Sequence, residues 1–160
     1  MEAEHQYLSF RLGEETFALG ILAVREIIEY GGVTDVPMMP ACVRGVINLR
    51  GAVVPVLDLA SRLGRGASAI GRRSCIVIVE MGTAPEQQVL GLLVDAVNAV
   101  LDIDAAQIEP PPSFGAGLRN DFINGIGKVN GKFVILINLE AVLNVPEIAA
   151  MAGEGAACNP

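Results

Sequence analysis

The sequence has 160 residues, enough for one ordinary domain or two very small ones, and 52% of them are hydrophobic. Only 4% are aromatic and none is Trp, so Val, Ile, Leu and Ala must build the core, which suits thin sheets and small barrels. The formal net charge of −7 argues against a nucleic-acid-binding protein, because contacts with phosphates need clustered Lys and Arg. We therefore expect a protein partner.

Cysteine content and hydropathy indicate the compartment. Cys42, Cys75 and Cys158 are odd in number and widely spaced, and they predict neither a disulfide framework nor a zinc site. The initial segment MEAEHQYLSF is acidic and polar, whereas a secretory signal is basic and then apolar. Every apolar run ends well short of the ~20 residues that a membrane helix requires. We expect a soluble, cytoplasmic protein with no direct membrane insertion.

The first predicted strands lie in residues 7–12 and 17–28. The alternating segment YLSFRL favours a strand, and the short turn GEE separates it from FALGILAVREI. A helix over residues 23–28 is also compatible with the sequence, because periodicity alone does not separate a short apolar strand from a helix. We expect a strand there, and likewise over residues 94–100.

Residues 43–59, VRGVINLRGAVVPVLDL, predict a β-hairpin with Arg50 and Gly51 at its tip. Apolar, largely β-branched runs lie on both sides of this pair, and glycines bound them. The arginine is either a solvated turn residue or a residue displayed to a partner. Turn chemistry alone favours the first interpretation.

Residues 61–73, SRLGRGASAIGRR, predict a loop or hinge. Its four arginines form a basic cluster, for which a solvated loop is the simpler interpretation and anion binding the alternative. Three consecutive prolines exclude regular structure from residues 108–121. Residues 140–151 predict a helix that Pro146 should interrupt, and the tail from residue 152 is expected to fray.

The chain contains an internal duplication. At an offset of 80 residues Gly45 matches Gly125 and Gly51 matches Gly131, and at an offset of 73 residues FALGILAVREI matches LGLLVDAVNAV. The chain therefore reads as two all-β units of about five short strands each, which predict paired small barrels that close their own edges. We place the first copy over about residues 7–60, the linker at 61–73, the second copy at about 74–145, and the C-terminal helix and tail at 140–160.

The residue inventory indicates no catalytic or metal site. His5 is the only histidine and lies in a start that we expect to be flexible, so it is a poor catalytic base. GIGKVNGKF departs from the phosphate-loop pattern, and its Asn130 and Gly131 predict a tight structural turn with positive φ instead. Three aspartates of the second copy, Asp95, Asp102 and Asp104, lack the order of an EF-hand loop. We expect no enzyme activity, cofactor or metal.

Two opposite charges stand out in the first copy. Glu26 lies in an otherwise apolar stretch, and Arg50 lies at the hairpin tip. Their counterparts in the second copy are Ala99 and Asn130. Because the duplication kept the apolar pattern but not this pair, the pair points to recognition rather than folding.

Five motifs occur in order along the chain: VREI, VRGVINLRGAVVPVLDL, GLLVDAV, QIEPPP and INGIG. With them the sequence resembles the CheW-type chemotaxis coupling proteins from about Tyr7 to Val145. The resemblance implies one CheW-like domain over residues 1–160, built of two five-stranded β-barrels, one SH3-like and one OB-like. It also allows exchange of the N-terminal strands between the barrels.

The resemblance further implies a non-enzymatic adaptor that joins the tips of methyl-accepting chemotaxis receptors to the regulatory domain of the histidine kinase CheA. Such an adaptor is cytoplasmic and recruited to membrane-associated receptor arrays. The receptor-contact pattern of the family falls on Val24, Glu26 and Arg50, with Gly45 and Gly51 shaping the loops around them. It assigns no residue to the kinase contact.

Two alternatives stay open at this point. Within the family, the chain could serve a pilus, biofilm or developmental chemosensory system. From another class, an OB-type module could bind nucleic acid or an oligosaccharide. The second is disfavoured because only seven aromatic residues are available for stacking and no basic groove is evident.

Overall fold

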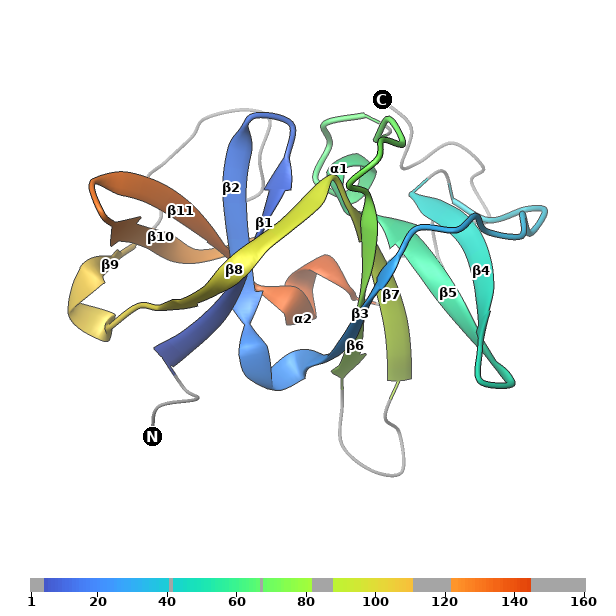
Figure 1. The fold of residues 1–160 in the computed structure, drawn as a ribbon, viewed down its shortest axis with the longest axis horizontal. Coiled ribbons are helices and arrows are strands. Elements are labelled where there is room, and N and C mark those ends of the chain that lie inside the picture. The colour runs from blue at the N-terminus through green and yellow to red at the C-terminus, as the bar shows by residue number, and fades with distance from the viewer. Residues whose placement is uncertain (1–4, 41, 67, 82–87, 111–121, 145–160) are drawn as a thin grey trace.

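The computed structural model describes residues 5–40, 42–66, 68–81, 88–110 and 122–144. These residues form two β-sheets side by side, with two short helices near the contact between them (Figure 1). The predicted all-β class is confirmed. The strands are β1 (Gln6–Leu12), β2 (Glu15–Gly20), β3 (Val24–Glu29), β4 (Val43–Leu49), β5 (Ala52–Asp58), β6 (Cys75–Met81), β7 (Gln88–Val94), β8 (Ala96–Asp102), β9 (Ile108–Glu109), β10 (Ile123–Val129) and β11 (Lys132–Ile137). The α-helices are α1 (Leu59–Arg62) and α2 (Leu139–Val142), and the 3-10 helices are η2 (Ile21–Ala23) and η3 (Ala105–Gln107).

The strand order mixes the two halves of the chain. The six-stranded sheet has the order β8-β1-β2-β11-β10-β9, and the five-stranded sheet has the order β3-β6-β7-β5-β4. Thus β1 and β2 lie between strands of the second half, and β6 and β7 lie between strands of the first half. The joining pairs, β2 with β11 and β5 with β7, are parallel, whereas the hairpins are antiparallel.

The two sheets repeat each other in detail. In the β4–β5 hairpin the register shifts between Val43 and Gly45, and in the β10–β11 hairpin it shifts at the corresponding place before Gly125. Each hairpin leads into a helix of four residues, capped by Asp58 or Asn138. These caps are 80 residues apart, which is the offset of the sequence repeat.

Neither hydrogen-bonded ladder closes into a complete barrel among the described residues, so the expectation that each barrel closes its own edges is wrong. In each sheet a short contact instead narrows the gap between the two open edges, which we call the seam. Thr34 forms a single bridge with Val46 in the five-stranded sheet, and Glu109 of β9 pairs with Ile126 in the other sheet. The two sheets are therefore strongly curved but open.

The main hydrophobic cluster joins the two sheets. It combines apolar side chains of β1 and β2 with those of β6 and β7, and it includes Leu59 of α1 and Val142 of α2. Alternate residues of β6 face a different cluster, because successive side chains of a strand point to opposite faces. Val77 belongs to the joining cluster, whereas Ile76 and Ile78 belong to the cluster of the five-stranded sheet.

The sequence suggested that the arginines of the linker, residues 61–73, form one solvated cluster. The structure shows that they do not. Arg62 is 6% exposed, and its Nε donates to the Val142 carbonyl at 2.7 Å while its guanidinium lies 4.8 Å from the centre of the Phe122 ring. Arg65 forms an ion pair with Glu15. The other two arginines of the linker are exposed. Arg62 and Arg65 therefore attach the linker to α2 and to β2 of the six-stranded sheet.

Several local expectations have clear outcomes. The strands expected over residues 23–28 and 94–100 occur as β3 and β8, although Ala23 belongs to the 3-10 helix η2 and Asp95 separates β7 from β8. Residues 108–109 form β9, so the exclusion of regular structure from 108–121 is wrong at its start, and residues 111–121 lie outside the described residues. The expected helix at 140–151 begins as α2, while residues 145–160 also lie outside the described residues.

The N-terminal segment is attached to the six-stranded sheet. The carbonyl of His5 accepts from the backbone N–H of Ile103 at 2.8 Å, so the backbone of this histidine is anchored rather than free. None of the helices in the described ranges is long and apolar enough to cross a membrane.

Candidate functional site

The tip of the β4–β5 hairpin is a two-residue turn. Arg50 has φ 51° and Gly51 has φ 91°, the pair of positive φ values of a type I′ turn. The side chain of Asn48 accepts from the backbone N–H of Gly51 at 2.8 Å and fixes the turn further. A positive φ is unusual for arginine, which indicates that the turn fixes the backbone of Arg50. The side chain therefore projects from a well-defined position.

Glu26 reaches this tip from β3, an edge strand of the same sheet. The ladder between β3 and β6 shifts its register around Arg25, because Val24 pairs with Val79 and Glu26 pairs with Ile78. Such a bulge twists the strand and changes the direction of nearby side chains. The sheet thus brings the carboxylate to an arginine 24 positions along the chain.

Glu26 and Arg50 form a two-point ion pair. The Glu26 carboxylate accepts from Nη2 of Arg50 and, at 3.4 Å, from Nη1. The hydrogen bond and then the attraction between the charges raise the pKa of the Arg50 guanidinium. The side chain of Arg50 is 68% exposed and that of Glu26 is 29% exposed. The carboxylate therefore orients a cation that remains accessible from solvent.

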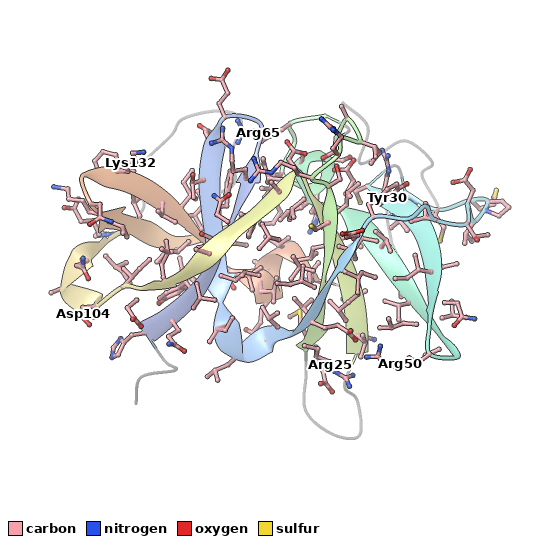
Figure 2. All side chains as sticks on the ribbon, in the orientation of Figure 1. Arg25, Tyr30, Arg50, Arg65, Asp104 and Lys132 are labelled. Carbon is pink, nitrogen blue, oxygen red and sulfur yellow. The ribbon has the colours of Figure 1, made fainter. Side chains whose placement is uncertain are left out.

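A second ion pair lies beside the first. Nε of Arg25 is 3.6 Å from a carboxylate oxygen of Glu80, at the end of β6. In the view of Figure 2, Arg25 and Arg50 both lie at the lower edge of the five-stranded sheet. The sequence alone does not indicate Arg25 or Glu80, since only the pairing of β3 with β6 brings them together. The site thus combines two ion pairs, whose residues Arg25 and Glu26 are neighbours in β3.

The other residues of the predicted receptor-contact set occupy different positions. Val24 is half-buried and packs against the main hydrophobic cluster, two residues before Glu26 in β3. Gly45 pairs with Val56, four ladder positions before the turn, which is about 14 Å along the strand. The structure therefore brings Glu26, Arg50 and Gly51 together and leaves Gly45 at the far end of the hairpin.

The corresponding tip in the six-stranded sheet has the same backbone but different side chains. Asn130 has φ 52° and Gly131 has φ 79°, close to the values at Arg50 and Gly51. The strand opposite carries Ala99 where β3 carries Glu26. This tip therefore has the turn without the ion pair.

The surroundings of the ion pair suit binding to another protein. Val53, just after the turn, is 71% exposed. An exposed aliphatic side chain on the same hairpin as an oriented arginine is a feature of protein interfaces. No group of three or more His, Cys, Asp or Glu side chains that could hold a metal ion occurs in the described part of the chain.

Comparison with known proteins identifies the family. A model of the CheW-like domain matches residues 6–147. A probable chemotaxis protein CheW of Rhizobium etli is 36% identical over 149 residues, which cover 93% of this chain and 94% of the relative. The chemotaxis protein CheW of Rhizobium meliloti is 36% identical over 86% of each chain. The crystal structure of the scaffolding protein TtCheW of Thermoanaerobacter tengcongensis matches with a TM-score of 0.77 and 38% identity over 89% of each chain. The chain therefore belongs to the family of proteins with a CheW-like domain.

Proposed function

We propose that this protein is a non-enzymatic adaptor that couples methyl-accepting chemotaxis receptors to the histidine kinase CheA. Membership of the CheW-like family supports chemotaxis signalling, and the relatives named above are chemotaxis proteins. The oriented Glu26–Arg50 pair carries the proposal, because it is an exposed, asymmetric feature that the duplicated fold does not require. The protein acts in the cytoplasm and is recruited to membrane-associated arrays through its partners.

The proposed receptor surface consists of Glu26, Arg50 and Gly51, with Val24 two residues before Glu26 in β3. In this surface Glu26 holds the arginine fork in place before the receptor arrives, which lowers the entropy lost on binding. Gly51 allows the turn that projects the arginine. Gly45 acts indirectly, because the absence of a side chain leaves room for the contact of Thr34 with β4.

The kinase regulatory domain binds a separate surface, because an adaptor with one shared surface could not bridge two partners. Each contact can be weak, since an array links many contacts through high effective concentration. The assay is equilibrium binding of the CheA regulatory domain to the full chain, with and without saturating soluble receptor tips from the same organism. We expect the kinase affinity to change by no more than about twofold and a ternary complex to form. Displacement of the kinase by receptor tips would contradict bridging.

A further inference from the structure

The tip of the β10–β11 hairpin concentrates positive charge in a chain whose net charge is −7. Lys128 and Lys132 are the only two lysines of the sequence, and both are exposed beside the turn. Neither forms an ion pair with a described residue, whereas four of the arginines each pair with a carboxylate. The charge of the two lysines is therefore available to a partner.

An exposed aromatic ring lies on the same hairpin. Phe133 is 64% exposed and lies directly opposite Lys128 in the ladder. Nζ of Lys128 is 6.0 Å from the centre of the ring, a geometry that favours a cation–π contact. The next residue, Val134, is buried inside the sheet, so strand alternation directs Phe133 away from that core. The ring is not needed to fill the interior.

A hollow of about 350 Å³ lies beside this tip, between β1, β8 and β11. Its lining includes the cationic residues Arg11 and Lys132 and the apolar residues Leu101 and Phe133. In the five-stranded sheet the Glu26–Arg50 pair links the corresponding strand and turn. Here the counterparts are the shorter Ala99 and Asn130, which both line the hollow. The second copy thus offers an opening where the first copy has an ion pair.

We propose that this hairpin tip and its hollow bind an acidic peptide segment of a protein partner, with a large apolar side chain of the segment as anchor. The lysines attract the carboxylates, and the hollow and Phe133 accept the apolar anchor. A peptide fits better than nucleic acid, because among the described residues only three cations, Arg11, Lys128 and Lys132, gather here, and the net charge of the chain is negative. Lys132 lies far from Arg50 in Figure 2, so this surface is separate from the proposed receptor surface and independent of its function.

The test is an NMR titration of the full chain with three short synthetic peptides. The first contains Asp and Glu around a central Leu-Phe pair, the second replaces that pair with Ser, and the third replaces the acidic residues with Lys. We expect the first to bind at least about tenfold more tightly than the others, with amide shifts centred on residues 98–101 and 128–134. Binding should weaken as salt is raised.

Two matched pairs of variants locate the binding. The double variant Lys128→Glu/Lys132→Glu should lose at least about tenfold in affinity for the first peptide, whereas Arg72→Glu/Arg73→Glu, with the same change of net charge, should retain it. Phe133→Ser should weaken binding, and Val53→Ser, a substitution at the corresponding position of the other tip, should not. Undiminished binding by the lysine variant, shifts centred on Arg50, or tighter binding of a single-stranded oligothymidylate would overturn the proposal. Self-association of the protein through this tip, detected by sedimentation, would also overturn the proposal. It would indicate that a second copy of the chain occupies the hollow.

Discussion

Gly45 lies where the chain before β4 comes close to that strand. A Cβ atom on Gly45 would lie 2.3 Å from the carbonyl oxygen of Thr34, and its φ of 152° is itself rare for other residues. Gly125 has the same role in the six-stranded sheet, because its Cβ would lie 2.8 Å from the carbonyl oxygen of Glu109. The two glycines therefore leave room for the contacts that narrow the seams.

The variant Gly45→Ala should lower the free energy of unfolding by about 2–4 kcal/mol, because the added methyl group meets backbone that cannot move aside. Denaturant unfolding of the purified protein measures this loss. The control is Gly20→Ala, where nothing lies within 4 Å and φ is −61°. The control should be neutral or slightly stabilising. Equal stability of the two variants would show that the seam has more space than the structure gives it.

The two short helices α1 and α2 stabilise each other across the joined sheets. Asp58 caps α1 and accepts from Ser68 N–H at 2.7 Å, which holds part of the linker against the cap. Arg62, the last residue of α1, donates to the backbone carbonyl of Val142 at the end of α2. A buried arginine at carbonyls of a helix C-terminus satisfies groups that would otherwise lack hydrogen-bond donors.

Replacement of Arg62 by Ala should cost about 2–4 kcal/mol of unfolding free energy, because it removes these hydrogen bonds and leaves a cavity at the Phe122 ring. Arg72→Ala is the matched control, since Arg72 belongs to the same linker and is exposed. Thermal and denaturant unfolding of both variants provide the comparison. If Arg62→Ala were no more destabilising than the control, the helix contact would contribute little to stability.

The elements that sequence predicts best are those made by local patterns. Alternating apolar residues and turn pairs identify both hairpins, and the repeat shows that they are equivalent. The exchange of β1 and β2 into the other sheet is different, because it depends on pairing between residues far apart, such as Phe17 with Ile135. The burial of Arg62 also depends on a helix 80 positions away. A charged, glycine-rich segment reads as solvated until that partner is known.

One duplicated scaffold presents two chemically different hairpin tips. One tip carries Arg50 held by Glu26, and the other carries two lysines and an exposed phenylalanine. Glu26 and Arg50 could be selected from the sequence because the repeat lacks them in its second copy. Arg25 and Glu80 could not, because no motif links a residue of β3 to the end of β6.

The most direct test of the adaptor function is the Arg50→Glu variant, measured for binding to soluble receptor tips and to the CheA regulatory domain side by side. Reversing this charge removes an attractive contact and adds repulsion, so receptor affinity should fall at least about 30-fold. Kinase affinity should stay within about twofold and the melting temperature should be nearly unchanged, because an exposed ion pair contributes little to stability. Arg72→Glu, with the same change of charge, should bind both partners normally. Equal loss of affinity for both partners, or a large drop in melting temperature, would mean that Arg50 is a structural turn residue and would contradict the proposed receptor surface.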